Sequence, residues 1–286
     1  MKILFAKHMG FCSGVRRAIK IAMNSLKNDP KPVQFLGEIV HNELVISEVN
    51  KKGGKTISSF DKAEEGTVII RAHGLPPTKT PENIKLRDTT CPLVEKVQKT
   101  AQKFYKEGYQ VIIIGDKEHS EVKGIDGYTE NSSIIISDIE KAKKLDPPKK
   151  AAALIQTTKD HQKAEKIIGI LKEKIDDFKW EDTICPEVVS RQKELEKIFE
   201  KAEGILVIGS KKSANTSRLI QMAKDKNKKI WWINIKQELV EALGEEGFGN
   251  IETLGVVSGT SSPDCEVEKI KKYLKENFED YKKISK

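Results

Sequence analysis

Val111-Ile-Ile-Ile-Gly115-Asp-Lys-Glu-His119-Ser-Glu121 is the stretch that decides the fold of this 286-residue chain. Four apolar residues in a row are typical of a short strand buried on both faces, as in a parallel sheet. The glycine ends this run, and polar residues follow it directly. The stretch therefore predicts a buried parallel strand whose carboxyl end carries His119 and Glu121.

The same pattern occurs at two other places in the chain. One reads Gly37-Glu-Ile-Val-His41-Asn-Glu43, and the other reads Gly209-Ser-Lys-Lys-Ser213-Ala-Asn215. A cysteine precedes each of the three glycines by a nearly constant interval, which is 25 residues from Cys12 and 24 residues from both Cys91 and Cys185. A shared interval with shared contents indicates an internal repeat.

Each repeat contains further strand-like runs. One run ends in polar residues, at Arg71-Ala-His73, at Gln156-Thr157-Thr158 and at Ser258-Gly-Thr-Ser261. Another precedes each cysteine, over residues 84–87, 178–181 and 3–6. Helices are predicted after the cysteines, for example over 94–107 and 188–201, because Pro92 and Pro186 suit the first helical position.

These elements predict an α/β protein built from three similar α/β units. We expect the units at 14–90, at 92–184, and at 186–286 together with 1–11, because the N-terminal strand has the place in the repeat that completes the third unit. The cysteines should stand at loop-to-helix junctions.

Composition narrows the class of protein. No run approaches the roughly 18 apolar residues of a membrane span, and the charged N-terminus is no secretory signal, so we expect a cytoplasmic protein with reduced cysteines. The net charge of +8 attracts polyanions, although the lysines are scattered and aromatic residues are only 6% of the chain. Charge alone therefore does not separate a solvated surface from a nucleic-acid-binding face.

The repeated cysteines point to a metal centre. If the units pack around an approximate threefold axis, three thiolates meet at one point, and soft thiolates select zinc, copper(I) or an iron–sulfur cluster. Structural zinc normally takes four ligands in closely spaced pairs, so three distant cysteines favour a cubane with one open iron. The alternative is that these are ordinary buried cysteines, and Cys265, which lies outside the repeat, is interpreted as structural.

The other repeated positions suit a phosphorylated substrate. Small donors beside predicted helix N-termini, with three of the five histidines, make a cradle for a phosphate or diphosphate: Ser213, Asn215, Ser261, His41, His73 and His119. Glu121 is the candidate proton donor, with His119 and Thr157 as relays. Glu43 holds the same repeat position, so symmetry alone does not separate the two acids.

Several familiar motifs are absent. Gly54-Lys55-Thr56 resembles the end of a P-loop, but Val49 stands where its first glycine belongs. No GxGxxG follows a strand, and no HExxH or CxxxCxxC run occurs. Electrons for a redox reaction would therefore come from another protein.

Together these segments resemble the 4-hydroxy-3-methylbut-2-enyl diphosphate reductase (LytB) family. The resemblance spans the whole chain and rests on the following motifs: Gly10-Phe-Cys12-Ser-Gly-Val-Arg-Arg-Ala18, Gly37-Glu-Ile-Val-His-Asn42, Arg71-Ala-His-Gly74, Asp88-Thr-Thr-Cys-Pro92, His119-Ser-Glu121, Gln156-Thr-Thr158, Ile184-Cys185, Ser213-Ala-Asn215 and Ser258-Gly-Thr-Ser-Ser-Pro263.

The resemblance implies a fold, a cofactor and a reaction. It implies a pseudo-threefold α/β trefoil around one [4Fe–4S] cluster, with Cys12, Cys91 and Cys185 as ligands and a fourth iron open to substrate. Two electrons and two protons would remove the allylic hydroxyl of the substrate as water, giving isopentenyl and dimethylallyl diphosphates in the last step of the non-mevalonate isoprenoid pathway.

The resemblance also implies site residues and partners. The substrate-binding positions would be His41, His73, His119, Thr157, Ser213, Ala214, Asn215 and Ser261. Glu121, His119 and Thr157 would be catalytic. Ferredoxin or flavodoxin would donate electrons to a monomer that binds neither nucleic acid nor membrane, and the positive net charge suits such acidic donors.

Three positions depart from the family pattern. Ala214 replaces a usual serine, Ser13 stands where an aromatic residue is frequent, and Pro186-Glu187-Val188 stands where Ala and Thr are common. None of these is an expected cluster ligand. They put substrate affinity in doubt more than the chemistry.

Two other classes of function remain open from the sequence. An open iron could serve as a Lewis acid in a hydratase or dehydratase of a phosphorylated metabolite, with no net redox change. A basic chain with a structural cluster could instead bind nucleic acid, in which case its binding would depend steeply on salt.

Overall fold

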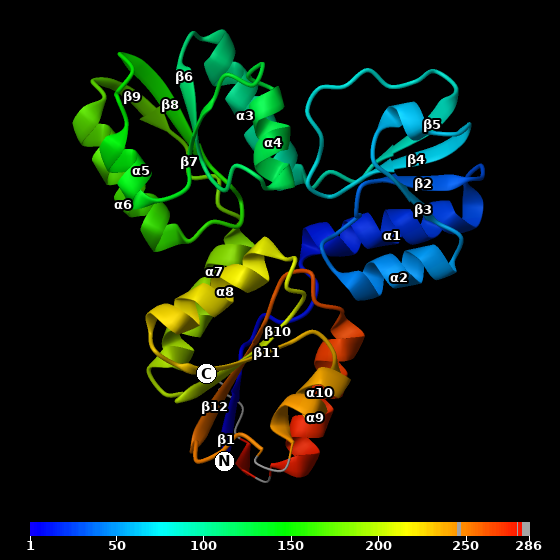
Figure 1. Ribbon diagram of the computed structural model, residues 1–286, viewed down its shortest axis with the longest axis vertical. Coiled ribbons are helices and arrows are strands. Elements are labelled where there is room, and N and C mark those ends of the chain that lie inside the picture. The colour runs from blue at the N-terminus through cyan, green and yellow to red at the C-terminus, as the bar shows by residue number, and fades with distance from the viewer. Residues whose placement is uncertain (245–246, 279, 282–286) are drawn as a thin grey trace. The chain divides into compact units, whose positions relative to one another are not determined.

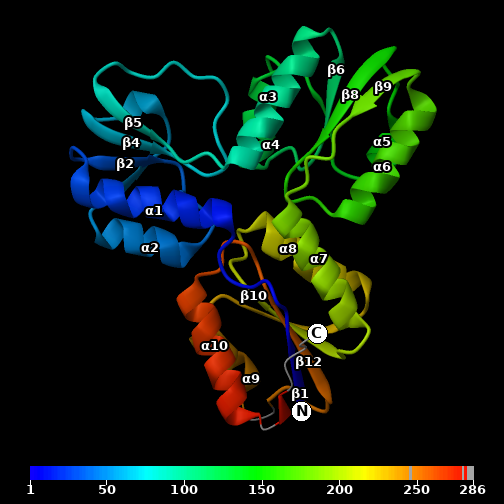
Figure 2. The same ribbon diagram turned by 180° about the vertical axis from the view of Figure 1, so that it is seen from behind.

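The computed structural model describes residues 1–244, 247–278 and 280–281. The chain forms two compact units. The first comprises residues 1–13, 41–45 and 186–286, and the second comprises residues 14–40 and 46–185. Each is described by itself below, and Figures 1 and 2 show their elements from two opposite sides.

The first unit is built on one sheet in the order β11-β10-β12-β1-β13. Its strands are β1 (Lys2–Phe5), β10 (Gly204–Ile208), β11 (Lys229–Ile233), β12 (Thr253–Ser258) and β13 (Asp280–Tyr281), and all of its ladders are parallel. Its helices are α7 (Pro186–Phe199), α8 (Ala214–Asp225), α9 (Lys236–Leu243) and α10 (Asp264–Asn277).

Both faces of this sheet are covered by helices (Figures 1 and 2). Ile205 and Val207 of β10 lie in a core with residues of α7 and α8, such as Leu195. The alternate residues, Leu206 and Ile208, lie in a second core with residues of α9 and α10. The alternation explains the unbroken apolar run, since side chains of a strand point to opposite faces and both faces here are buried.

The second unit contains two parallel sheets. One has the order β3-β2-β4-β5, with strands β2 (Val33–Leu36), β3 (Lys55–Ile57), β4 (Gly66–Ile70) and β5 (Ile84–Asp88). The other has the order β7-β6-β8-β9, with strands β6 (Gln110–Ile114), β7 (Ile134–Ile136), β8 (Lys150–Ile155) and β9 (Asp177–Trp180).

The remaining helices precede or lie between these strands in the sequence. They are α1 (Ser13–Asn28), α2 (Glu43–Lys51), the short 3-10 turn η1 (Phe60–Lys62), α3 (Pro92–Lys106), α4 (Ser120–Gly127), α5 (Ile139–Lys144) and α6 (His161–Lys174). Val111 and Ile113 of β6 pack against α3 and α4 in one core, which fixes the start of α4 beside the end of the strand.

The three sheets share one strand order. In each, the strand that follows a cysteine-led helix lies between the next strand and the third strand, and a fourth strand pairs with the third. In the first unit β1 takes this fourth place, because it pairs with β12 in the register Lys2 to Thr253 through Phe5 to Val256. The prediction of three similar parallel α/β units is therefore confirmed.

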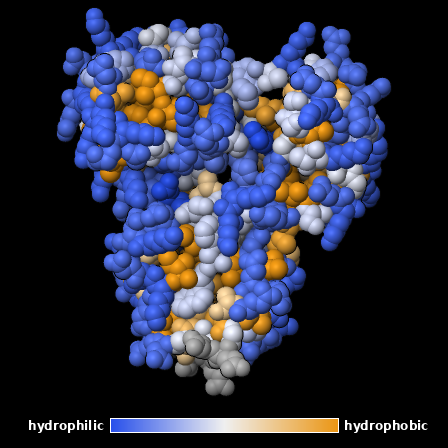
Figure 3. Space-filling view, in the orientation of Figure 1, coloured by the Kyte–Doolittle hydropathy of each residue, from blue (hydrophilic) through white to orange (hydrophobic). Residues whose placement is uncertain are grey.

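The visible surface in Figure 3 is mostly hydrophilic, with smaller apolar patches between the polar residues. This agrees with the charged fraction of 33%. Within the described residues, no helix is both long enough and apolar enough to pass through a membrane.

Candidate active site

The three repeated glycines occupy equivalent places in the structure. Each directly follows the first strand after a repeated cysteine and donates its N–H to the last residue of the neighbouring strand. The N···O distances are 2.9 Å from Gly37 to Ile57, 3.0 Å from Gly115 to Ile136 and 2.7 Å from Gly209 to Ile233. The sequence repeat thus corresponds to a repeated turn at the carboxyl edge of each sheet.

The three repeated cysteines are equivalent as well. Each directly precedes a helix, and each donates its N–H to the second residue after the third strand of its sheet. The bonds run from Cys12 to Thr260, from Cys91 to Ala72 and from Cys185 to Thr157, all at 2.9 Å. The predicted loop-to-helix junctions are therefore confirmed, and Cys265 instead lies exposed in the first turn of α10.

In the second unit, Glu121 and Thr157 form a buried pair. Glu121 is 1% exposed in the first turn of α4, and both of its oxygens accept hydrogen bonds from Thr157. The Thr157 N–H lies 2.7 Å from Oε1, and the Thr157 hydroxyl lies 2.7 Å from Oε2. The structure thus brings together two of the three predicted catalytic residues.

Burial raises the pKa of the Glu121 carboxyl, and the two bonds from Thr157 act in the opposite direction. The net rise keeps a proton on this side chain at higher pH than an exposed glutamate would hold it. Glu43 differs, because it is exposed and accepts bonds from the Ser210 hydroxyl at 3.0 Å and the Asn234 amide at 3.3 Å. The structure therefore separates the two acids that the repeat alone does not.

His119 is the third predicted catalytic residue and stands directly before α4. Its Nδ1 accepts a hydrogen bond from the Glu121 N–H at 3.2 Å, so the imidazole caps the helix that carries the acid. The ring of His73 meets the ring of His119 edge-on, with 5.6 Å between centroids. Cys91, Cys185, His73, His119, Glu121 and Thr157 thus all belong to the second unit.

The first unit holds the other predicted residues, which are Cys12, His41, Ser213, Ala214, Asn215 and Ser261. The Ser213 hydroxyl caps α8 by accepting the Thr216 N–H at 3.3 Å, and Ala214 is the first residue of that helix. The Ser261 hydroxyl lies 3.4 Å from the carbonyl oxygen of His41, which it can donate to.

Asn215 carries the clearest mark of a ligand site in this unit. It is 2% exposed, and among the described residues neither its Oδ1 nor its Nδ2 has a hydrogen-bond partner. Burying an amide without partners costs free energy, and such groups are rare in folded proteins except where a ligand or ordered water completes them. A side chain at the start of α8, where the N-terminus favours anions, suits a phosphate.

The loop that carries Cys12 is held on several sides. Arg191 of α7, only 4% exposed, donates to the carbonyls of Gly10 at 2.8 Å, Ser258 at 3.0 Å and Gly259 at 3.1 Å. The Gly10 N–H also donates to the Ser258 hydroxyl at 2.8 Å. The Cys12 loop and the Ser258–Ser261 loop are therefore tied to α7 by one guanidinium group.

Two departures from the family pattern contact each other. The N–H of Ser13 donates to Oε1 of Glu187 at 3.0 Å, and its hydroxyl donates to the same oxygen. Glu187 follows Cys185 by two residues, so this pair joins the position after the first cysteine to the helix after the third. These bonds tie the start of α1 to the start of α7.

The cysteines fit an iron–sulfur cluster by their chemistry. All four cysteines are thiols, and the three at repeat positions are half-buried, while Cys265 is exposed. The three cysteine thiolates are soft donors, and their backbone N–H groups are already hydrogen-bonded. A closed structural zinc site uses four ligands, one more than these three. A cubane that takes three protein ligands matches this donor set.

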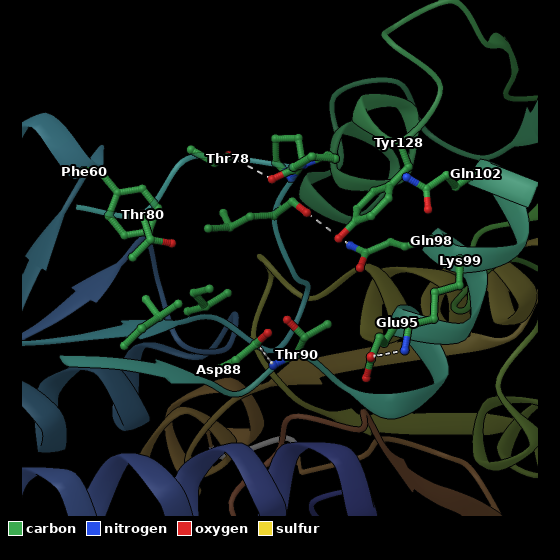
Figure 4. Close-up of a pocket in the computed structure, with 15 residues that line it drawn as sticks. Phe60, Thr78, Thr80, Asp88, Thr90, Glu95, Gln98, Lys99, Gln102 and Tyr128 are labelled. Atoms are coloured by element: carbon green, nitrogen blue, oxygen red, sulfur yellow. Dashed lines mark hydrogen bonds and ion pairs between the residues drawn. The ribbon is translucent and has the colours of Figure 1, made fainter. Parts of the chain in front are cut away.

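A separate hollow of about 460 Å³ lies in the second unit (Figure 4). Its lining includes the Asp88 and Glu95 carboxylates, and the Lys99 ammonium is already 2.5 Å from Glu95. Two carboxylates against one paired lysine repel a diphosphate. Among the described residues that line the hollow, none is a predicted site residue, so we do not place the substrate there.

Sequence reasoning missed Arg191, Lys159 and Asp116. Arg191 is one charge among many in a helix rich in Lys, Glu and Gln, and no periodic signal marks it as buried. Lys159 directly follows Gln156-Thr-Thr158, and its place after a buried strand was the available signal. Its partner Asp116 follows the repeated glycine in the same way.

Known proteins match this chain over almost its whole length. Residues 3–275 match the family model described as LytB protein. The chain is 35% identical over 283 residues to the 4-hydroxy-3-methylbut-2-enyl diphosphate reductase of Thermoanaerobacter sp. (strain X514), covering 96% of this chain and 97% of that protein. It is 37% identical over 280 residues to the enzyme of the same name from Dictyoglomus thermophilum, covering 96% of each.

Two solved structures are also similar. One is the E-1-hydroxy-2-methyl-but-2-enyl-4-diphosphate reductase from Plasmodium falciparum, with a TM-score of 0.87 and 27% identity over 99% of this chain and 91% of that one. The other is an (E)-4-hydroxy-3-methyl-but-2-enyl diphosphate reductase described as the terminal enzyme of the non-mevalonate pathway, with a TM-score of 0.67 and 32% identity over 96% of this chain and 99% of that one. With its repeated turns, its three equivalent cysteines and these matches, the chain belongs to the LytB protein family.

Proposed function

We propose that this chain reduces 4-hydroxy-3-methylbut-2-enyl diphosphate to isopentenyl and dimethylallyl diphosphates, the last step of the non-mevalonate isoprenoid pathway. The observation that carries the proposal is the buried acid Glu121, held by both donors of Thr157 in a chain that matches this family from residue 3 to residue 275. A reductive dehydroxylation needs a proton donor that is shielded from water, and the buried Glu121 carboxyl can serve as that donor.

The reaction consumes two electrons and two protons. The allylic C–O bond breaks, the hydroxyl leaves with one proton as water, and the other proton forms a C–H bond at either end of the allylic system. The two possible positions account for the two isomeric products. The diphosphate is unchanged and serves to hold the substrate.

Cys12, Cys91 and Cys185 would hold a [4Fe–4S] cluster, which when bound supplies the electrons and a Lewis-acidic iron for the allylic hydroxyl. The backbone of each cysteine is fixed by one bond of 2.9 Å, so little ordering of the ligand loops is needed on binding. This preorganisation supports the proposed ligand set.

Glu121 would deliver the proton to the leaving hydroxyl. When the carboxyl is protonated, the Thr157 hydroxyl can accept from it as well as donate, because a hydroxyl has both capacities. Burial raises the pKa of Glu121, so the carboxyl keeps its proton to a higher pH than an exposed glutamate would. The His119 cap fixes the first turn of α4 and so the direction of the carboxyl.

The diphosphate would be bound by side chains at the repeated positions. The Asn215 amide, which lacks partners among the described residues, would donate through Nδ2, together with Ser213 and Ser261. His41, His73, His119 and Thr157 would complete the site. Ala214 offers only its backbone at the position where a serine is usual, so one hydrogen bond is lost there.

We further propose a monomer with α/β units at 14–90, 92–184, and 186–286 with 1–11. Ferredoxin or flavodoxin would be the electron donor. The net charge of +8 supports an acidic donor, because opposite charges speed the encounter of two proteins.

The test is a reductase assay under exclusion of oxygen. Iron-loaded protein is mixed with 4-hydroxy-3-methylbut-2-enyl diphosphate and reduced methyl viologen, and loss of the blue colour is followed with the products. Substrate-dependent bleaching with both five-carbon diphosphates supports the proposal. Conversion of the substrate without consumption of the reductant would instead indicate a hydratase.

A further inference from the structure

Lys159 is a buried lysine that pairs with the Asp116 carboxylate close to the site. The residue is 3% exposed, and its Nζ lies 2.7 Å from Oδ1 of Asp116, whose side chain is about half exposed. Lysine is almost never fully buried unless it is paired, since the ammonium loses its hydration. Asp116 therefore helps to hold the Lys159 ammonium in this buried position.

The pair joins the same two segments as the Glu121–Thr157 pair. Asp116 and Glu121 belong to the segment after β6, and Thr157 and Lys159 belong to the segment after β8. Gln156 makes one further bond between the two segments and one within the second segment. Its Oε1 accepts the Asp116 N–H at 2.9 Å, and its carbonyl accepts the Lys159 N–H at 3.0 Å. The two segments are thus tied on both sides of Thr157.

Thr157 is the residue at which these bonds meet. Its N–H and hydroxyl donate to Glu121, and its carbonyl oxygen accepts the N–H of Cys185 at 2.9 Å. A shift of this residue would change the environment of the acid and the backbone of a proposed cluster ligand together. Displacements of about 1 Å at such a point are enough to reduce turnover strongly.

Stability alone does not account for a buried lysine here. Removing the lysine ammonium from water costs free energy, and a pair with a half-exposed carboxylate offsets only part of this cost. A pair of this kind is better explained by the single arrangement that it imposes on the chain. The same reasoning applies to polar groups that support a catalytic residue from behind.

We propose that Asp116 and Lys159 are positioning residues, which hold Thr157 in the place where it fixes both the Glu121 carboxyl and the Cys185 backbone. The inference rests on the proposed function for its catalytic consequence. Its structural part concerns the Thr157 N–H alone and can be measured whether or not the chain reduces this substrate.

The experiment compares Lys159→Met with a matched control, Lys143→Met, in the iron-loaded full chain. Lys143 pairs with Glu140 at 2.9 Å on the exposed face of α5, so the same substitution there removes a solvated ion pair. Amide hydrogen exchange at Thr157 is followed by mass spectrometry with fragmentation, and the Phe35 amide in β2 serves as the reference. Turnover and KM are measured in the same preparations.

We expect exchange at Thr157 to accelerate about tenfold or more in Lys159→Met and in Asp116→Asn, while exchange at Phe35 stays unchanged. We expect kcat to fall about tenfold with KM within about twofold, and Lys159→Arg to recover part of the loss. Lys143→Met should behave as the unaltered chain does.

Unchanged exchange at Thr157 in both Lys159→Met and Asp116→Asn would overturn the proposal. If Lys159→Met accelerates exchange at Phe35 as well, the whole fold is loosened and the Asp116→Asn result decides whether the proposal holds. Asp116→Asn keeps the Lys159 side chain in its buried position. An unaltered chain with no reductase activity would overturn the proposed function, while the exchange data would still test the positioning of Thr157.

Discussion

Glu121 and Glu43 show how one position of a repeat acquires two different roles. Both stand six residues after a repeated glycine, but Glu121 is enclosed and Glu43 faces water. Enclosure without a cation is what raises the pKa of Glu121, since the charged form loses hydration and gains only the bonds from Thr157. The acid of the site is defined by its surroundings more than by its place in the repeat.

Replacing Glu121 with glutamine should abolish most turnover while the side chain keeps its shape. We expect kcat to fall by a factor of about 10² or more, with iron content and substrate binding retained, because the amide cannot deliver the proton. Stopped assays of product and a binding titration measure the two effects separately. A rate near that of the unaltered chain would place the acid at another residue.

The raised pKa of Glu121 also gives the direction of the pH dependence. The protonated form is the active one, so turnover should fall as pH rises through this pKa, and the decline should be missing from the residual rate of Glu121→Gln. The free energy of unfolding should change in the same direction, because the folded state binds the Glu121 proton more tightly than the unfolded state. This contribution is lost as pH rises from the ordinary glutamate pKa of about 4.3 through the raised pKa of the folded state. Rate and unfolding profiles over pH measure both.

At the scale of secondary structure, helix starts do most of the positioning. The three cysteines directly precede α1, α3 and α7, and His119 and Ser213 directly precede α4 and α8. The starts after the cysteines and beside Ser213 could be predicted from the sequence, because proline and small polar residues mark helix boundaries and the marks recur at fixed intervals. The start after His119 was not predicted. The bonds that fix the starts were not visible, since they join residues far apart in the chain.

The hydrogen bonds of Arg191 are an example. Its guanidinium donates hydrogen bonds to residues 67 to 181 positions away, and its sequence context is that of an ordinary surface helix. The same holds for Lys159 and Asp116, 43 residues apart. Periodicity predicted which faces are buried, but it carries no information about which polar group meets which.

Arg191→Met should loosen the Cys12 loop. Three carbonyl oxygens would lose their charged donor, and we expect the free energy of unfolding to fall by about 2–4 kcal/mol. In metal-free protein, alkylation of Cys12 should become several-fold faster. Lys193→Met, on an exposed position of the same helix, is the control. Equal alkylation rates in the two variants would contradict this role for Arg191.

Asp29 connects the end of α1 to the edge strand β5. Its buried carboxylate accepts bonds from Arg87 Nε at 2.8 Å and from Lys85 Nζ at 2.7 Å. The Arg87 bond is the main reason that the pKa of Asp29 lies well below its usual range, and the Lys85 bond adds to it while burial opposes both. This charge supports folding wherever it is ionised in both states.

Asp29→Asn should therefore cost stability at neutral pH. We expect a loss of about 1–3 kcal/mol at pH 7, from the charged hydrogen bonds that disappear. A lowered folded pKa contributes stability above the unfolded value of about 3.9, and this contribution is lost as pH falls toward the folded pKa. Urea unfolding at several pH values should show the two proteins converging below about pH 4, and a constant difference would contradict the assignment.

For the molecule as a whole, the net charge of +8 bears on its electron supply. With an acidic ferredoxin, we expect turnover at limiting donor to fall several-fold between low salt and about 0.5 M salt, because screening removes the attraction. Reduced methyl viologen is a cation and should show no such fall. Equal salt dependence for the two donors would argue against an acidic partner.

The strand order β11-β10-β12-β1 has a consequence for the making of the protein. Lys2–Phe5 is translated long before its partner strand Thr253–Ser258, because Lys2 pairs with Thr253, 251 residues further along the chain (253 − 2). Thr260, which holds the Cys12 backbone, emerges later still. The backbone bond of Cys12 can therefore form only after Thr260 has been translated. A circular permutant that moves residues 1–11 behind residue 286 would remove the delay for the pairing of β1 with β12, but not the delay for Cys12.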